Sequence, residues 1–486
     1  MERFYRYSTV PVKEGKDERE KASFKVGVVA VAVLIVAATF LVPNPEGLAF
    51  EGKMLIGLLA AAIVLWVTEA IPILITAWLF AAAVPILGIL SPGETWAGGV
   101  SVAMVLCLSC FAFALFIQHS TISLRIIARV LRWAGNNSAK ALAGLMLATA
   151  VLSAIIDDLV LVLMMLPFAY KILDENETPW GGKSALAKAL VLGVAFSSYI
   201  GGYITPVGSV VNVLAMGFAE QALGVTVTFA NWMVLGTVTA VVMLPITWFA
   251  LVKILKPEPI SDEALARIEE EHAALPGFTR DEVWGMLVVL GAMVLWVAGS
   301  WFPALDIVVV GLVALGLLFL PPFKCVSFKR YCDESPWQVV MLNWAVGCVV
   351  AGMLATGSMS WLVGAVFGPM SGLPLIAVLL IVAVFACVFH NILPAGAAVA
   401  GLITIPVCTL VAGMGGNVTA AIFLCAVFSC AAFLLPLDLC VYCAYSSERK
   451  YFTPFDEMKV GWVPSVVAIA MVALVIPGVC TLMGLQ

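Results

Sequence analysis

The sequence predicts an all-α polytopic membrane protein with about eleven transmembrane helices, two re-entrant hairpins and an internal inverted repeat. Of its 486 residues, 63% are hydrophobic and only 11% are charged, which excludes a soluble globular fold. The apolar residues form runs close to the roughly 20 residues that a helix needs to cross hydrocarbon. Period-2 alternation is weak along these runs, so a membrane β-barrel is excluded as well.

The apolar runs that predict the membrane segments follow one another at short intervals. They lie at residues 24–42, 53–68, 71–90, 100–118, 140–172, 186–221, 231–254, 283–300, 305–320, 338–356, 374–412, 417–445 and 460–483. The first run is full-length and no small-residue cleavage site follows the basic N-terminus. We therefore expect residues 1–23 to form a cytosolic tail and the first helix to be retained.

The positions of Lys and Arg assign the loops to the two sides of the membrane, because cytoplasmic loops are enriched in both residues. With the N-terminus inside, every Lys and Arg except Lys53 falls in the cytoplasm, and four loops without Lys or Arg fall outside. These outer loops are 91–99, 222–230, 301–304 and 357–373. The alternation holds only if 140–172 and 374–412 each enter and leave on one side. Both segments are therefore predicted to be re-entrant hairpins. We expect the protein to be an integral protein of a bacterial plasma membrane.

The chain divides into two similar halves. Asn231–Gly236, which follows one interrupted apolar run, resembles Asp456–Gly461, which follows another. Two halves that each contain a hairpin and a broken helix are typical of inverted-repeat secondary transporters. The predicted divisions are a first half at 24–254 with hairpin 140–172 and broken helix 186–221, a cytosolic linker at 255–282, and a second half at 283–486 with hairpin 374–412 and broken helix 417–445.

Two adjacent carboxylates, Asp157 and Asp158, lie at the predicted tip of the first hairpin, inside an otherwise apolar run. A charge at membrane depth costs roughly 2.5–3.5 kcal/mol even on the lenient insertion scale, so an intramembrane acid indicates a functional site. We interpret the pair as an ion or proton site. The alternative is a structural one, in which one acid caps a helix at the tip and the other is protonated.

The repeat is expected to bring a set of polar and glycine positions together near the membrane midplane. The predicted ion- and substrate-binding residues are Ser153, Asp157, Asp158, Gly201, Thr205, Gly208, Ser209, Asn212, His390, Asn391 and Asp438. Oxygen ligands suit Na⁺, for which Asp157, Asp158 and Asn212 are the predicted ligands. The glycines permit unwinding and close approach of the backbone. His390 has two interpretations, a satisfied core residue or a coupling group at the second tip.

Residues 66–72 and 200–212, with Met164–Pro167, resemble segments of the divalent anion:sodium symporter family of the wider ion-transporter superfamily. Residues 66–72 read W-V-T-E-A-I-P, similar to that family's W-x-T-E-A-I-P signature. Residues 200–212 resemble its I-G-G-x-x-T-x-x-G-T-P-P-N segment, and Met164–Pro167 matches the end of its first hairpin. The resemblance covers about 54–461 and implies an elevator-type, cation-coupled carrier of di- or tricarboxylates that works as a homodimer.

The departures from the family lie at the tips. Where the family has Ser-Asn-Thr, the first tip has Asp157, Asp158 and Leu159. Read together, Ser153–Asp158 is more similar to the S-A-x-x-D-N tip of sister branches, which include sodium/proton antiporters and arsenite or citrate carriers. At the second tip the equivalent is either His390-Asn391 or Pro394-Ala395-Gly396. Carboxylates with no neighbouring Lys or Arg repel a dianion unless Na⁺ or H⁺ neutralises them.

The function expected is therefore Na⁺- or H⁺-coupled transport of small organic anions. The alternatives are a sodium/proton antiporter or a carrier of another inorganic anion, and a transport-inactive membrane receptor or scaffold. The sequence contains no nucleotide-binding loop and no catalytic triad, so we do not expect an enzyme. We expect no cofactor beyond the coupling ion. The expected partners are a small anion and the lipid bilayer, and not nucleic acid. Cys107-x-x-Cys110 and Cys440-x-x-Cys443 have metal-site spacing but lack supporting His or Cys residues.

Overall fold

The computed structural model describes residues 17–485 except 69, 101, 180, 274–276, 368–369, 371, 394–395 and 447–448. Most of the predicted N-terminal tail, Glu69 of the W-V-T-E-A-I-P segment, and Pro394 and Ala395 at the second tip thus lie outside the described residues. The described part of the chain is helical throughout and contains no β-strand. The predicted all-α membrane protein is confirmed.

The first half begins with an apolar helix and ends with a long one. Its elements are α1 Asp17–Leu41, α2 Phe50–Thr68, α3 Ile73–Ile86, α4 Pro92–Gly98, α5 Val102–Gln118, α6 Ile122–Ala134, α7 Ser138–Ser153, α8 Asp158–Glu175, α9 Ala185–Gly202, the 3₁₀ turn η1 Pro206–Gly208, α10 Val210–Leu223 and α11 Phe229–Leu255. Helices α7 and α8 pack against each other across a four-residue turn, at the position predicted for the first hairpin.

The second half repeats this order after the linker helix α12 Asp262–Ala273. Its elements are α13 Arg280–Gly299, α14 Ile307–Leu318, α15 Phe328–Glu334, α16 Trp337–Ala355, α17 Ser358–Phe367, α18 Leu375–Ile392, α19 Gly396–Gly413, α20 Val418–Cys430, α21 Leu439–Tyr445, α22 Pro454–Ala470, the π segment η3 Met471–Val475 and α23 Ile476–Leu482. Helices α18 and α19 pack together as the counterpart of α7 and α8, and α20 and α21 flank an interruption as α9 and α10 do.

The packing between the halves follows the same repeat. Helix α3 packs on α16 of the other half, and its counterpart α14 packs on α5. The ring of Trp96, on α4, stacks on Trp344 of α16, with centroids 5.4 Å apart. In the equivalent place, the hydroxyl of Tyr331 on α15 donates to the carbonyl of Leu108 on α5 at 2.9 Å. The opposite insertion of the halves in the membrane stays a prediction.

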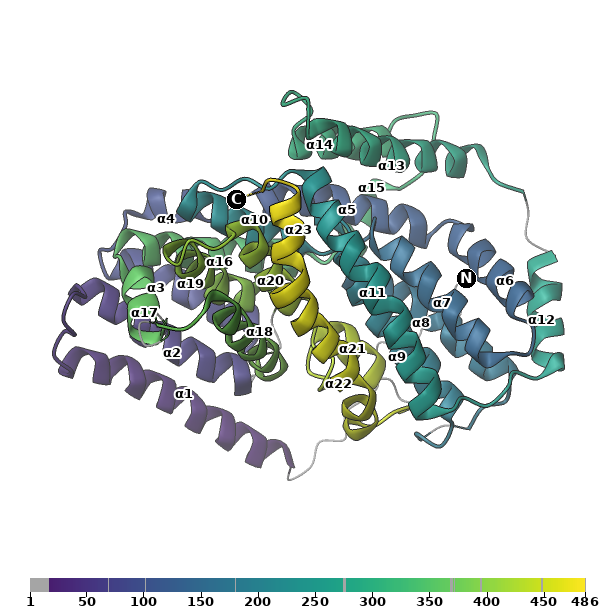
Figure 1. The fold of residues 1–486 in the computed structure, drawn as a ribbon, viewed down its shortest axis with the longest axis horizontal. Helices are drawn as coiled ribbons and strands as arrows, with labels where there is room; N and C mark the ends of the chain where they lie inside the picture. Colours follow the sequence, from purple (N-terminus) through teal and green to yellow (C-terminus); the bar gives the residue numbers. More distant parts are fainter. Residues whose placement is uncertain are drawn as a thin grey trace.

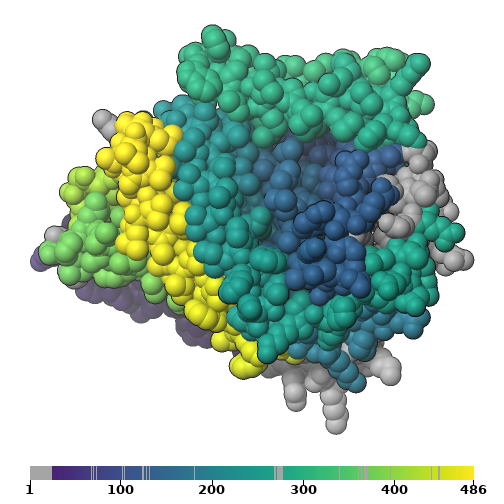
Figure 2. Space-filling view, turned by 45° about the vertical axis from the view of Figure 1, so that its right-hand side comes forward, coloured from purple at the N-terminus to yellow at the C-terminus, as the bar shows by residue number. Residues whose placement is uncertain are grey.

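Helices α11 and α22 occupy equivalent positions and lie side by side through the middle of the molecule (Figure 1). Figure 2 shows α11 and the yellow α22–α23 segment as neighbouring bands on one face. Each helix begins with a Thr N-cap: Thr228 accepts from the backbone N–H of Asn231, and Thr453 accepts from that of Asp456. A side-chain acceptor there satisfies an N–H that the first helical turn leaves without a partner.

Seven helices of the described chain are long and apolar enough to cross a membrane, by length and composition alone. The same number of apolar helices of 10–17 residues are shorter, among them α5, α7, α10 and α20. Several predicted runs are divided at breaks and turns, so single helices fall below the length of a full span. The molecule is a multi-pass integral membrane protein, and the count of about eleven spans stays a prediction.

Candidate ion and substrate site

The candidate site lies where the two hairpins meet the two broken helices. We call the α7–α8 junction, Ala154–Asp157, tip 1, and the segment between α9 and α10, Tyr203–Ser209, break 1. The α18–α19 junction is tip 2, and the segment between α20 and α21, Ala431–Asp438, is break 2. Unwound backbone at membrane depth needs protein partners for its N–H and C=O groups, so each break depends on side chains around it.

Tip 1 is tied to α9 and break 1 by hydroxyl groups. The hydroxyl of Ser153 donates to the Ser198 carbonyl of α9 at 2.7 Å, and that of Thr205 donates to the Ala154 carbonyl at 2.6 Å. Two of the predicted glycines allow this close packing: a Cβ at Gly208 would lie 2.6 Å from the Ser153 carbonyl oxygen, and a Cβ at Gly201 would lie 2.3 Å from that of Ala150. These glycines serve close backbone approach.

Asn212, on α10, holds the unwound backbone of break 1. Its side-chain amide donates to the carbonyls of Gly202 at 2.8 Å and Thr205 at 3.0 Å. The side chain is fully buried, and its Oδ1 has no hydrogen-bond partner among the described residues. A buried acceptor of this kind is costly unless a ligand satisfies it, and an amide oxygen suits a hard cation.

Asp157 and Asp158 are both buried and make different contacts. Asp157 occupies the N-cap position of α8, while its Oδ2 accepts from the backbone N–H of Val210, the first residue of α10, at 3.1 Å. Asp158 Oδ2 lies 2.9 Å from the thiol of Cys430, at the end of α20, which donates to it. The acids therefore connect tip 1 to helix ends in both halves. Ser209, the N-cap residue of α10, also contacts the Cys430 thiol.

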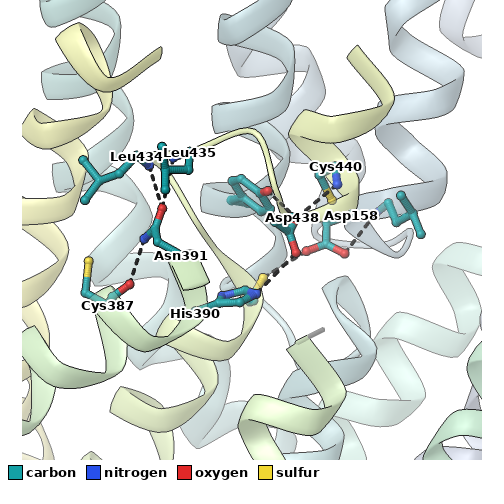
Figure 3. Close-up of polar contacts among 11 residues, drawn as sticks. Asp158, Cys387, His390, Asn391, Leu434, Leu435, Asp438 and Cys440 are labelled. Carbon is teal, nitrogen blue, oxygen red and sulfur yellow. Dashed lines mark hydrogen bonds and ion pairs between the residues drawn. The ribbon is translucent and has the colours of Figure 1, made fainter. Parts of the chain in front are cut away.

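Asp438 is the centre of a second group of contacts, shown with Asp158 in Figure 3. Its Oδ1 accepts from the Tyr199 hydroxyl and from the backbone N–H of Cys440, which makes Asp438 the N-cap residue of α21. Its Oδ2 lies 3.3 Å from Nε2 of the fully buried His390. Neither ring nitrogen of His390 makes a well-directed hydrogen bond in the described part of the chain.

Asn391, next to His390 in the last turn of α18, holds break 2. Its Oδ1 accepts from the backbone N–H groups of Leu434 and Leu435, both at 3.1 Å, and its amide donates to the Cys387 carbonyl at 2.7 Å (Figure 3). Asn391 thus does for break 2 what Asn212 does for break 1. Gly396 begins α19, and a Cβ there would lie 2.3 Å from the Ser429 carbonyl oxygen.

The electrostatics of the site are dominated by its acids. In the described part of the chain, Asp157, Asp158 and Asp438 form no ion pair with Lys or Arg, and His390 is the basic side chain that approaches them. Carboxylates out of water need a proton or a cation to offset the loss of hydration. Asp157, Asp158 and Asn212 carry buried oxygens around tip 1 and break 1, and carboxylate and amide oxygens are ligands of the kind that Na⁺ takes.

Three residues that the sequence did not single out belong to this region. Tyr199 and Cys430 each hydrogen-bond a site acid from the other half of the chain. Glu457, on α22, is fully buried and lies close enough to Asp438 for an electrostatic interaction. Glu457 could have been found from the sequence because it is a carboxylate directly before an apolar run. Tyr199 and Cys430 lie inside apolar runs, where they look like ordinary core residues.

An all-helical multi-pass fold, with paired hairpins and broken helices around buried polar groups, is typical of secondary membrane transporters. The family model described as a citrate transporter, CitMHS, matches residues 63–432. The chain belongs to this citrate transporter family. This match confirms the expected resemblance to divalent anion:sodium symporters. Members of the family are transporters and not enzymes.

Curated relatives and solved structures agree with this class. The chain is 24% identical over 396 residues to the sodium-dependent dicarboxylate transporter SdcS of Staphylococcus saprophyticus, covering 76% of each protein. It is 26% identical over 381 residues to SdcS of Staphylococcus aureus strain RF122, covering 74% of this chain and 72% of that one.

Two solved transporters share the fold. The YdaH transporter of Alcanivorax borkumensis matches with a TM-score of 0.53 and 11% identity, covering 80% of this chain and 87% of that one. MtrF of Neisseria gonorrhoeae, from a class of antimetabolite efflux pumps, matches with a TM-score of 0.55 and 13% identity, covering 94% of each chain. At these identities the likeness concerns the fold alone.

Proposed function

We propose that this protein is a secondary active transporter that uses a sodium gradient to move a small di- or tricarboxylate across a bacterial plasma membrane. The observation that carries the proposal is the burial of Asp157, Asp158 and the unpartnered Oδ1 of Asn212 in the region of tip 1 and break 1. The printed function of the SdcS relatives, sodium-dependent dicarboxylate transport, supports both the ion and the substrate class.

The charges suggest an order of binding. Two carboxylates in a poorly hydrated site repel a dianion, and the positive ends of the nearby helices offset only about half a charge each. Sodium at tip 1 removes this repulsion, so Na⁺ binds before the anion. Polar groups of the site then contact the substrate carboxylates.

The hairpins and broken helices make up the part of the molecule that we propose to move. Tip 1 holds break 1 through Thr205, and tip 2 holds break 2 through Asn391, so each hairpin is fixed to a broken helix. We propose that this unit shifts, elevator-like, against a scaffold formed around the pairs α3–α16 and α5–α14, and that two copies assemble through their scaffolds, with the N-termini in the cytoplasm.

Uptake by purified protein in liposomes tests the function. Radiolabelled succinate, citrate and sulfate are each presented with an inward Na⁺ gradient, with a K⁺ gradient in its place, and with a pH gradient. We expect Na⁺-driven uptake of one or both carboxylates and none of sulfate. Uptake driven equally by K⁺, or no uptake of any carboxylate, contradicts the proposal.

A sodium/proton antiporter is the second candidate, because paired acids at a hairpin tip can exchange ions without an anion. The same liposomes with an entrapped pH dye distinguish it. Proton movement driven by Na⁺ in the absence of any carboxylate supports the antiporter and overturns the symporter.

A further inference from the structure

Glu457 is a buried acid that the proposed transport site leaves without a role. It lies in the first turns of α22, its side chain is inaccessible to solvent, and neither carboxylate oxygen has a hydrogen-bond partner among the described residues. Most buried acids are paired or hydrogen-bonded, because an isolated carboxylate loses its hydration on burial. An acid kept in this state is a candidate for a functional ionisable group.

The internal repeat shows what Glu457 replaces. Counting from the N-caps Thr228 and Thr453, the fifth residue is Trp232 in the first half and Glu457 in the second. Trp232 donates from Nε1 to the carbonyl of Tyr203 in break 1 at 3.1 Å. Glu457 therefore occupies the position from which the first half supplies an N–H donor to a break, and a carboxyl group supplies a donor only when it is protonated.

The glycines one turn further along confirm that these two positions face the breaks. A Cβ at Gly236 would lie 1.9 Å from the Tyr203 carbonyl oxygen, and a Cβ at Gly461 would lie 1.7 Å from that of Phe433 in break 2. Residues four apart share one face of a helix. Glu457 thus lies on the face of α22 that packs against break 2, which carries Asp438.

The surrounding charges do not offset a negative Glu457. At the start of α22 the Thr453 hydroxyl accepts from the N–H of Asp456, and the Asp456 carboxylate accepts from the N–H of Thr453, in a reciprocal capping box. Asp456 also pairs with Lys188 at 2.7 Å. Asp438 adds a further negative charge. The remaining ionisable groups on the elements around α22 are Tyr199 of α9, Lys253 of α11, Cys387 and His390 of α18, and Cys440, Tyr442, Cys443 and Tyr445 of α21.

Asp456, the residue before Glu457, and its partner Lys188 are both partly exposed to solvent. The side chains of Lys188 and Asp456 are 20% and 15% exposed, on the side that the sequence assigns to the cytoplasm. No group of three or more His, Cys, Asp or Glu residues in the described chain offers a metal site here or elsewhere. With water near and a cage of ligands lacking, the ion that suits Glu457 is a proton.

We propose that Glu457 is a proton-binding site that faces break 2 and exchanges its proton with cytoplasmic water during transport. The role of Glu457 in transport rests on the proposed function, but the binding of a proton by Glu457 does not. The protonated carboxyl donates to break 2, as Trp232 does to break 1. Loss of the proton places a second negative charge beside Asp438 and weakens the packing of α22 on the break, so protonation and movement are linked.

Infrared spectroscopy of the purified protein tests proton binding without any need for transport. We expect the wild-type spectrum near neutral pH to contain a protonated-carboxyl C=O band that is missing from Glu457→Gln, with Asp456→Asn keeping it. Identical carboxyl bands in wild type and Glu457→Gln overturn the proposal. If Glu457→Gln does not fold, Asp438→Asn serves instead. This variant removes the negative charge next to Glu457, so the protonated-carboxyl band should disappear at a lower pH than in wild type. A band that disappears at the same pH as in wild type overturns the proposal.

Uptake in liposomes tests the transport role. We expect wild-type Na⁺-driven uptake to vary at least about threefold between pH 6 and pH 8, and Glu457→Gln to retain uptake with a flat profile. A pH profile in Glu457→Gln that equals the wild-type one overturns that role. If no carboxylate is taken up by the wild type but the infrared band depends on Glu457, the proposed function fails and the proton site stands.

Discussion

The hydroxyl of Tyr199, in the first half of the chain, donates a hydrogen bond to Oδ1 of Asp438, in the second. The same carboxylate accepts from the N–H of Cys440 and lies beside His390. Asp438 is therefore held from α9, α18 and α21 together. Because these elements come from both halves, the contact connects the two broken helices within the candidate site.

Replacing Tyr199 with Phe removes this donor and leaves Asp438 short of one hydrogen bond in a buried place. We expect a loss of stability of about 1–3 kcal/mol and a clear decrease in carboxylate uptake. Thermal unfolding in detergent and initial uptake rates measure both effects. Unchanged stability and uptake in Tyr199→Phe would show that the contact is not important.

Tyr203 offers a matched control on the same helix end. Its hydroxyl is buried and has no hydrogen-bond partner among the described residues. Tyr203→Phe removes an unsatisfied polar atom, so we expect stability to be equal to or greater than that of wild type. A loss as large as that of Tyr199→Phe would mean that the bulk of the hydroxyl, and not the bond to Asp438, decides the result.

Gly236 and Gly461 are predicted to be intolerant of any side chain. A Cβ at either position would lie less than 2 Å from a break carbonyl, at 1.9 Å and 1.7 Å respectively, and backbone atoms cannot move aside cheaply. We expect Gly236→Ala and Gly461→Ala each to cost at least about 1–3 kcal/mol, with poor yield of folded protein. Size-exclusion profiles and thermal unfolding provide the measurement.

Gly291 on α13 is the control for these glycines, since a Cβ there would meet nothing within 4 Å. Alanine is a better helix former than glycine by roughly 0.5–1 kcal/mol, so Gly291→Ala should be neutral or stabilising. If all three alanine variants behave alike, close approach to the breaks is not the role of Gly236 and Gly461.

Asp157 and Asp158 carry the prediction on sodium. Asparagine keeps the size of each side chain and removes its charge, so we expect Asp157→Asn and Asp158→Asn to raise the half-saturating Na⁺ concentration at least about tenfold, about 1.4 kcal/mol in binding. Uptake against Na⁺ concentration measures this. Asp306→Asn, at the N-cap of α14 away from the site, should leave it unchanged. Wild-type sodium dependence in both tip variants would refute the ion site.

The sequence predicted the all-helical membrane fold because that fold follows from one-dimensional patterns, and the same patterns indicated where to look for a site. Apolar runs define helices, the distribution of Lys and Arg requires hairpins, and Asp157 and Asp158 are conspicuous where apolar residues are expected. The breaks were also predictable, since glycines and Pro206 interrupt one run and Pro436 interrupts the other. The structure has helix ends at these places.

The partners of the site residues could not be predicted, because they come from far along the chain. Tyr199 and Asp438 are 239 residues apart, and Asp158 and Cys430 are 272 apart. A tyrosine or a cysteine inside an apolar run has no pattern that distinguishes a hydrogen-bond donor from a core residue. Only the packing of one half against the other gives these side chains their contacts.

Glu258, in the linker between the halves, carries a prediction on acid stability. It accepts from the N–H groups of Ala185 and Leu186 at the start of α9, and from the Ser184 hydroxyl. Partial burial raises the pKa of Glu258, but these hydrogen bonds outweigh it and hold that pKa below its ordinary value. The stabilisation is therefore present at neutral pH and is lost as the pH falls below about 4.5 through the depressed pKa.

Glu258→Gln should lower stability at neutral pH by less than about 1 kcal/mol, because the group is solvent-exposed and screened. The difference from wild type should shrink toward acid pH. Thermal unfolding at pH 7 and pH 4 measures it, with Glu263→Gln on the exposed face of α12 as the control. A difference that grows at acid pH would contradict the assignment.

Asn391 is the side chain on which break 2 depends, because its Oδ1 accepts from the N–H groups of both Leu434 and Leu435. Alanine leaves two backbone donors without a partner, each costing about 1–3 kcal/mol where water cannot reach them. We expect Asn391→Ala to decrease carboxylate uptake at least about tenfold, the effect of 1.4 kcal/mol on the active state. Asn343 on α16 is also a buried amide, and its nitrogen has, among the described residues, only the weak acceptor Cys107 Sγ at 3.7 Å. Asn343→Ala should therefore cost less, and equal losses in the two variants would show that Asn391 acts through packing and not through break 2.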